Sequence, residues 1–358
     1  MPRRRCSKPR HSKSESRANS SVNLTVLTLL FFACGRTGSP AQKSLPETVK
    51  IDVDGPVKLV LLGDTGTVGD QGKTPQCDGQ TEGKIGLDKA GRERMIASIR
   101  RENADAILAL GDLVYPEGPE CTAGSIPPQA KAEMDRVFGD YIGQLGALSL
   151  VVLGNHDVNH DGRGNAKTEA CFRNYAAARS DLHMPERNYI AEVGKVRIGV
   201  VDTNRLPGPG LAKKIADEMV AGPDSWWRVM AGHHVLRTYQ NKEDQDRVAP
   251  WLAANDISPD LWVNGHAHLL QFGVYDVAGK AIPAATSGTG AKVRCRSECG
   301  SGSTGPCGAG QQWGRSEFGY ATVAATEQML RVSYKNTDGK TLWCWQRDRG
   351  TAVGQECP

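Results

Sequence analysis

The chain has 358 residues, of which 39% are hydrophobic and 23% are charged. This composition supplies enough apolar side chains for a folded core, and it excludes a disordered chain, a collagen-like repeat and a polytopic membrane protein. The first 17 residues account for +6 of the net charge of +4, which leaves about −2 for the rest of the chain. Because a slightly acidic body does not attract nucleic acid in general, we expect no nucleic acid as a specific partner.

Residues 1–33 have the pattern of a signal peptide. A basic, serine-rich stretch leads into an apolar run over residues 22–33, which is too short to span a bilayer permanently. Cys34 follows a small residue at the end of this run, as in a bacterial lipoprotein signal. We therefore expect export from a bacterial cell, to the periplasm or to the outer membrane as a lipoprotein anchored through Cys34. An ordinary cleaved signal and an uncleaved anchor are the alternatives.

Residues 34–56 are polar and contain proline, which is typical of a tether. One domain is expected over residues 57–358, with a cysteine-rich C-terminal extension from about residue 293. Eight cysteines lie in this domain, and an even number in an exported protein favours disulfides whose pairing stays open. The segment 295–307 holds three cysteines and would also allow a zinc cluster. It is rich in glycine and lacks histidine, so a cross-linked loop is favoured.

Short apolar runs recur along the domain, and turn residues bound each of them, as in buried strands. The runs cover residues 57–62, 106–110, 148–153, 196–201, 227–231 and 261–263. Helical spacing of apolar residues predicts helices around residues 87–99, 134–141, 211–219 and 248–252. This alternation indicates an α/β domain with its site at the carboxyl ends of the strands. Two later runs, 272–277 and 329–334, are expected to be antiparallel strands.

Residues that can bind a metal follow five of these runs, and a glycine stands before each of them. The segments are Gly63-Asp64-Thr65-Gly66, Gly111-Asp112-Leu113-Val114-Tyr115, Gly154-Asn155-His156-Asp157, Gly232-His233-His234 and Gly265-His266-Ala267-His268. The glycine allows a sharp turn and removes bulk beside a site. One such segment alone is more typical of a turn or a helix cap. Five of them at strand ends favour a shared metal site.

In this order, the five segments resemble the motifs of the calcineurin-like metallophosphoesterases. Tyr115 is further similar to the tyrosine of the purple acid phosphatases, and the absence of a long β-domain before residue 57 resembles their short, single-domain members. The resemblance covers about residues 57–292. It implies a β-sandwich of two mixed sheets flanked by helices, an α/β/β/α arrangement, with the metal site at the carboxyl ends of the strands.

By motif position, the resemblance implies two metal ions. Fe(III) would be held by Asp64, Asp112, Tyr115 and His268, and a second ion, Fe(II), Zn(II) or Mn(II), by Asp112, Asn155, His233 and His266. Carboxylate and phenolate oxygens suit a trivalent ion, whereas neutral amide and imidazole donors suit a divalent one. His156 would lie outside the ligand set as the catalytic acid that protonates the leaving group. His234 would lie behind the ligands or be incidental.

The resemblance implies an acid phosphatase that hydrolyses small phosphate monoesters by direct attack of a metal-bound hydroxide, without a covalent intermediate. The alternative is a phosphodiesterase or nucleotide hydrolase on the same two-metal scaffold, and Tyr115 favours the monoesterase. A surface binding module that has lost catalysis is disfavoured because all seven expected ligands are present. Residues 116–128 and the glycine-rich stretch after His160 are candidates for substrate contacts.

Overall fold

The structure is a computed structural model that describes residues 42–67, 84–122, 124–158, 166–237, 247–295, 298–303 and 305–358, except for the side chains of residues 84 and 85. The chain separates into two compact units, residues 1–36 and 37–358, and every described residue belongs to the second. The signal peptide and the lipidation site predicted at Cys34 lie outside the described residues. Within the described ranges, no helix has the length and apolar character that crossing a bilayer requires.

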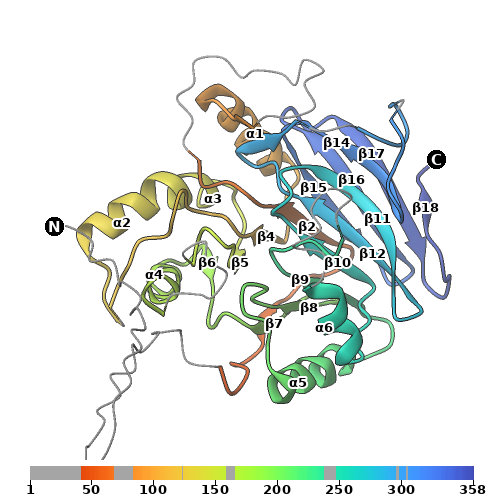
Figure 1. Ribbon diagram of the computed structural model, residues 1–358, viewed down its shortest axis with the longest axis horizontal. Coiled ribbons are helices and arrows are strands. Elements are labelled where there is room, and N and C mark those ends of the chain that lie inside the picture. Colours follow the sequence, from red (N-terminus) through yellow and green to blue (C-terminus); the bar gives the residue numbers. More distant parts are fainter. Residues whose placement is uncertain are drawn as a thin grey trace, which may run out of the picture. The chain divides into compact units, whose positions relative to one another are not determined.

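Two eight-stranded sheets form the second unit (Figure 1). The first contains β1 (Val49–Ile51), β7 (Tyr189–Val193), β8 (Val196–Val200), β9 (Trp227–Ala231), β10 (Leu261–Asn264), β12 (Lys280–Ser287), β11 (Leu270–Val277) and β14 (Gln311–Arg315), in this spatial order. The second contains β18 (Gln355–Glu356), β17 (Thr341–Asp348), β16 (Met329–Asn336), β15 (Gly319–Ala325), β2 (Val57–Leu62), β4 (Ala106–Leu110), β5 (Ser149–Val152) and β6 (Leu182–His183), also in this order. A separate pair joins β3 (Lys84–Gly86) to β13 (Lys292–Arg294).

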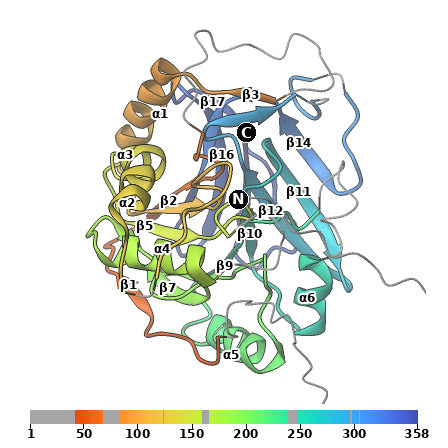
Figure 2. The same cartoon turned by 60° about the vertical axis from the view of Figure 1, so that its left-hand side comes forward.

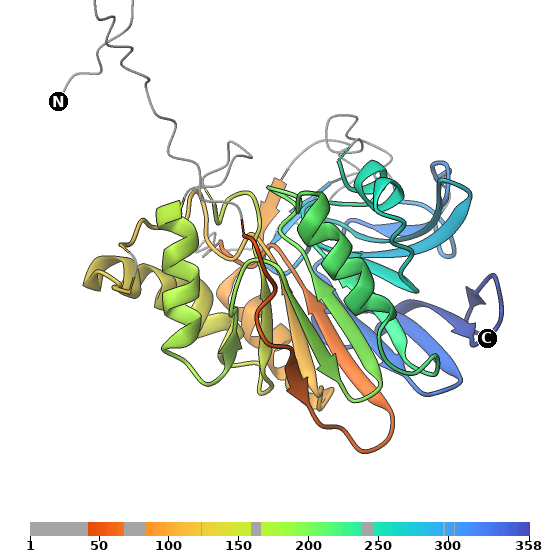
Figure 3. The same cartoon turned by 90° about the horizontal axis from the view of Figure 1, so that it is seen from below.

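Helices cover the outer face of each sheet (Figures 2 and 3). The helices are α1 (Lys89–Arg101), α2 (Pro128–Met134), α3 (Asp140–Ile142), α4 (Ala166–Ala177), α5 (Pro209–Val220) and α6 (Val248–Ala254), and a π-helical turn (Asp135–Gly139) joins α2 to α3. Helices α1 to α4 pack on β2, β4 and β5, and helices α5 and α6 pack on the first sheet. The cap of α1 is Asp88, whose carboxylate accepts a hydrogen bond from Gly91 N at 2.7 Å.

The main core lies between the two sheets, where apolar residues of both sheets interdigitate. The middle strands are buried on both faces, because a helical layer covers one face and the other sheet covers the opposite face; all five residues of β4 are buried. This is the predicted α/β/β/α sandwich of mixed sheets, and the predicted fold class is confirmed.

The residues after position 293 complete both sheets. Strand β15 pairs with β2 in the antiparallel sense, with Val323 opposite Leu59, so it lies in the middle of the second sheet. Strands β14 to β17 also supply aromatic rings to the core, among them Trp313 and Trp343, whose ring centroids lie 5.5 Å apart in a stacked pair. The part that was expected to be an extension therefore belongs to the sandwich itself.

Most predicted elements are present with boundaries shifted by a few residues. Ten strands were not expected: β1, β3, β6, β7, β12, β13, β14, β15, β17 and β18. Helix α4 was not expected either, because its buried face includes alanine and cysteine as well as aromatic residues. Strand β1 lies within the predicted tether and pairs with β7 in the parallel sense, so the first sheet includes residues before Val57.

Three disulfides join described cysteines. They are Cys121–Cys171, Cys299–Cys307 and Cys344–Cys357. Cys295 is also disulfide-bonded. The cysteines of the segment 295–307 are thus cross-linked and not available as thiolate ligands, which supports the predicted cross-linked loop over a zinc cluster.

Candidate metal centre

The five predicted segments meet at one end of the sandwich. Asp64, Asp112 and Asn155 follow β2, β4 and β5, which are parallel neighbours in the second sheet. His233 follows β9, and His266 follows β10, its parallel neighbour in the first sheet. Because the carboxyl ends of parallel neighbours lie at one edge, each sheet presents its own donors there. The two sheets together bring these donors into contact with one another.

Four side chains make up what we call the tyrosine group: Asp64, Asp112, Tyr115 and His268. The Tyr115 hydroxyl lies 2.7 Å from Asp112 Oδ2, 3.1 Å from Asp64 Oδ1 and 3.2 Å from His268 Nε2. His268 Nε2 lies 3.1 Å from Asp64 Oδ1. Three oxygens and one nitrogen therefore face a common centre.

Four side chains make up the second set, the asparagine group: Asp112, Asn155, His233 and His266. His266 Nδ1 lies 3.0 Å from Asn155 Oδ1 and 3.1 Å from His233 Nε2, which itself lies 3.2 Å from Asn155 Oδ1. His233 Nε2 also lies 3.3 Å from Asp112 Oδ1. The two imidazole nitrogens and the amide oxygen thus form a triangle of possible ligand atoms.

Asp112 belongs to both groups. Its Oδ2 faces Tyr115 and its Oδ1 faces His233, so the two oxygens of one carboxylate point at two different centres. The backbone N–H of His156 donates to Oδ1 at 3.0 Å and helps to hold this orientation. Such a carboxylate has the geometry to bridge two cations.

The chemistry of these donors fits metal ions. Asp64 and Asp112 are almost completely buried, with at most 1% of either residue exposed, and a buried carboxylate needs a compensating positive charge. The ligand atoms of Asp64, Asp112 and His268 all lie within 4.8 Å of one another, and so do those of Asp112, His233 and His266. Each group could therefore hold a metal ion.

The carboxylates of the site shift the pKa values of neighbouring side chains. Burial raises the pKa of Tyr115, and the carboxylates of Asp112 and Asp64 raise it further, well above its usual range. Burial lowers the pKa of His233, but the Asp112 and Asp64 carboxylates and the hydrogen bond to the Leu110 carbonyl together raise it to about 10. Both shifts show a strongly negative site, in which a phenolate would form only with a cation beside it.

Residues 57–270 match the family model of the calcineurin-like phosphoesterases, which covers more than half of the chain and all seven donors. The chain belongs to this family. The resemblance found in the sequence is thereby confirmed. No curated protein sequence matches the chain.

Solved structures share the fold at low sequence identity. A purple acid phosphatase, PPD1, from yellow lupin (Lupinus luteus) seeds has a TM-score of 0.56 and 14% identity, over 81% of this chain and 53% of that one. GAP50, the anchor in the inner membrane complex of Plasmodium, has a TM-score of 0.54 and 12% identity, over 81% and 88%. PhoD has a TM-score of 0.53 and 11% identity, over 88% and 73%. This chain thus spans about half the length of the lupin protein.

The backbone of this phosphoesterase is unusual at the donors. Asp64, Asp112, His266 and His268 have φ values of 59°, 53°, 69° and 53°. Residues other than glycine rarely adopt this left-handed region, which costs about 1–3 kcal/mol at each position. Among the glycines that precede donors, only Gly111 has a positive φ. The expected sharp turn therefore falls mostly on the donor itself.

The glycines do remove bulk beside the donors, as expected. A Cβ atom on Gly154 would lie 2.1 Å from the backbone nitrogen of Asp112 and 2.2 Å from its Oδ1. A Cβ atom on Gly265 would lie 2.6 Å from Asp64 Oδ2. Both carboxylates thus occupy space that any larger residue would take.

Asp157 supports the phosphoesterase site through the backbone, a role that the sequence analysis missed. Its Oδ1 accepts hydrogen bonds from Leu113 N at 2.8 Å and Val114 N at 3.1 Å, and its Oδ2 accepts one from Gly154 N at 2.7 Å. Asp157 thereby ties the loop after β4 to the loop after β5. An aspartate in a turn after a strand is a common backbone acceptor, which was the available signal.

Two further histidines lie beside the ligand set. His156 is outside both groups: its Nδ1 donates to the Pro116 carbonyl at 2.6 Å, and its ring centroid lies 4.3 Å from that of Tyr115. His234 is buried, its Nδ1 lies 2.7 Å from Thr203 Oγ1, and its ring centroid lies 4.6 Å from that of His266. His234 therefore packs against the ring of His266, a candidate ligand, without belonging to either donor group.

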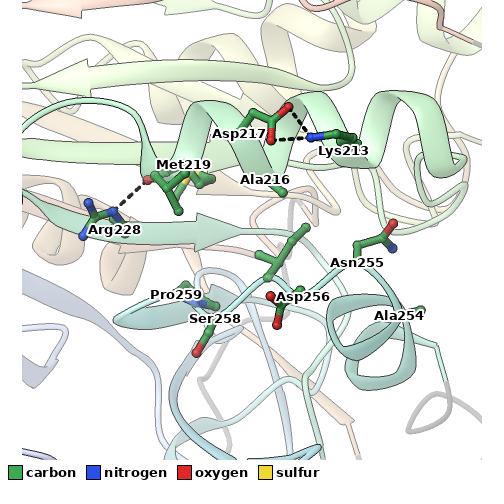
Figure 4. Close-up of a pocket in the computed structure, with 12 residues that line it drawn as sticks. Lys213, Ala216, Asp217, Met219, Arg228, Ala254, Asn255, Asp256, Ser258 and Pro259 are labelled. Carbon is green, nitrogen blue, oxygen red and sulfur yellow. Dashed lines mark hydrogen bonds and ion pairs between the residues drawn. The ribbon is translucent and has the colours of Figure 1, made fainter.

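A separate pocket of about 530 Å³ lies beside α5 and the segment between α6 and β10 (Figure 4). Lys213 pairs with Asp217 at its rim, and Arg228 Nε donates to the Met219 carbonyl at 2.8 Å. None of the seven donors lines this pocket. Its lining includes residues just before β10, whereas the donors follow the other ends of the strands, so we place the chemistry at the donors.

Proposed function

We propose that this phosphoesterase is an exported acid phosphatase that hydrolyses small phosphate monoesters at a binuclear metal site. The place of Tyr115 supports this best, because its hydroxyl contacts all three other members of the tyrosine group. A phenolate there would add a third anionic oxygen to two carboxylates, a donor set that suits Fe(III). The asparagine group would hold Fe(II), Zn(II) or Mn(II).

When bound, the two metal ions would supply Lewis acidity for the phosphoryl group and would activate a water molecule. The chain's own contribution is to position them. Asp112 would join the two centres through its two oxygens. The Nδ1–H of His233 donates to the Leu110 carbonyl at 2.7 Å, which leaves the lone pair of Nε2 directed into the asparagine group.

His156 would protonate the leaving group. Because its Nδ1 donates to the Pro116 carbonyl, Nε2 is the atom that would carry the transferable proton. General acid catalysis of this kind contributes about 10²–10⁴-fold to a rate. The contact with the Tyr115 ring would hold the imidazole beside the tyrosine group.

Export is part of the proposal. The basic leader, the apolar run and Cys34 support it, and so do the disulfides, which are typical of an oxidising compartment. A membrane anchor would be the lipid on Cys34. Mass spectrometry of the protein from the membrane fraction tests this: a modified Cys34 at the new N-terminus is expected, and an unmodified Cys34 contradicts lipidation.

The activity is tested on the full chain, purified without chelator, with one chromogenic phosphate monoester and the matching diester from acidic to neutral pH. We expect a monoester preference at acidic pH, two metals per chain including iron, and a visible absorption band. A diester preference near neutrality would favour the phosphodiesterase alternative. Activity on neither ester with metals bound would favour a binding module.

A further inference from the structure

A lysine on strand β13 lies beside the tyrosine group. Strand β13 begins at Lys292, and the backbone on both sides of this residue is hydrogen-bonded to donor residues. Ala291 N donates to the Asp64 carbonyl at 3.0 Å, and Arg294 N donates to the His268 carbonyl at 3.0 Å. These two bonds fix the backbone of Lys292 against the tyrosine group.

The side chain of Lys292 extends over Tyr115. Its Nζ lies 4.3 Å from the centroid of the Tyr115 ring, whose hydroxyl is the atom that joins the tyrosine group. Lys292 is only partly buried.

We propose that Lys292 is a substrate-binding residue that selects phosphate esters with two negative charges over esters with one. A lysine ammonium has three hydrogen-bond donors and no lone pair, so it binds an anion and not a metal ion. The anion that reaches this position is the phosphoryl group of the substrate. This inference rests on the proposed function and deepens it, because it assigns the part of the monoester preference that appears above the second pKa of the ester to a residue outside the donor set.

The preference follows from Coulomb's law. A phosphate monoester is largely a dianion above its second pKa of about 6, whereas a diester is a monoanion. At one distance, a cation attracts a dianion twice as strongly as a monoanion. Because a doubled interaction energy squares the fold-change, loss of the Lys292 charge should lower kcat/KM more for the monoester than for the diester. We expect a loss of about tenfold for the monoester and about threefold for the diester.

The experiment compares Lys292→Gln and Lys292→Arg with the natural chain, all full length and metal-loaded, at pH 7. Lys280→Gln is the matched control, because it removes the same charge at the far end of β12, where Lys280 pairs with the exposed Asp256 at 2.5 Å. Two readouts are taken: kcat/KM for a chromogenic monoester and its matching diester, and the dissociation constant of inorganic phosphate by calorimetry. Metal content and melting temperature show whether each variant is folded and loaded.

We expect Lys292→Gln to show the unequal losses and a phosphate dissociation constant raised about tenfold. Lys292→Arg should keep most of the activity on the monoester and most of the affinity for phosphate. Lys280→Gln should change neither the kcat/KM values nor the phosphate dissociation constant. Equal losses on the two esters, or unchanged phosphate binding, would overturn the assignment. If the natural chain hydrolyses neither ester, the proposed function fails, and the phosphate dissociation constant still decides whether Lys292 binds the anion.

Discussion

The tyrosine group and the asparagine group share Asp112, but different parts of the chain hold them in place. The tyrosine group is tied to the segment around β13, through the bonds from Ala291 N to the Asp64 carbonyl and from Arg294 N to the His268 carbonyl. These bonds come from residues after position 270, where the match to the family model ends. Part of the support of the tyrosine group therefore lies outside the matched region.

The asparagine group is supported from within the matched region. The side chain of Asn204 donates to the Leu153 and Gly154 carbonyls at 3.2 Å each, just before Asn155. Thr203 Oγ1 accepts a hydrogen bond from His234 N at 3.0 Å, next to the donor His233. The family match thus covers this group together with its support.

This difference shows how far a family match reaches. Both donor sets lie within residues 57–270, yet the residues that position one of them do not. The fold alone does not decide the function, because a purple acid phosphatase and a membrane-complex anchor share it with this chain. Single substitutions should separate the two groups by their chemistry, from a change that affects both groups to a change that affects one atom of one group.

Asp112→Asn should have the largest effect. It removes the charge that both groups share, so we expect both metals to be lost and activity to fall by about 10⁴-fold. Metal analysis of the purified protein and kcat/KM on a monoester measure this. Asp140→Asn, on the exposed surface of α3, is the control for loss of a carboxylate. Retention of both metals by the Asp112 variant would contradict the bridging role.

Gly154→Ala should come second, because it displaces the shared carboxylate without removing it. The new Cβ would lie 2.1 Å from the Asp112 backbone nitrogen, so the loop after β4 must shift. We expect weaker metal binding in both groups and activity lower by about 10³-fold. Gly208→Ala is the matched control, since it has φ −68° and no atom within 4 Å of a Cβ. Equal activity in the two variants would show that the close contact does not matter.

The donors could be predicted from the sequence, whereas part of the fold and some residues beside the donors could not. The strands before the donors are short apolar runs, and the donors follow them directly, so Asp64 and Asp112 could be placed at a common edge from the sequence. The position of β15 between β16 and β2 could not, because pairing between distant strands leaves no local pattern. Asp157 and Lys292 were missed because they act through contacts in space, with backbone N–H groups and with a ring.

His156→Ala should leave both groups intact and lower only the rate of the chemical step. We expect kcat to fall by about 10²-fold for an alkyl phosphate, whose leaving group needs a proton, with metal content unchanged. A chromogenic substrate with a stable phenolate leaving group should lose much less. The measurement is the loss of kcat on each of the two substrates. Equal losses would contradict the role of His156 as acid.

Tyr115→Phe should have the smallest effect on rate and the most selective effect on the two groups. It removes one hydroxyl, which contacts Asp64, Asp112 and His268 but no member of the asparagine group other than Asp112. We expect the visible absorption band to disappear, kcat to fall by about tenfold, and the metal of the asparagine group to be retained. Absorption spectra of metal-loaded protein with a matched iron analysis measure this. A band that persists at equal iron content would show that Tyr115 is not an iron ligand. The tyrosine group would then keep only Asp64 and the shared Asp112 as anionic donors, and the argument for a trivalent ion from a third anionic oxygen would fail.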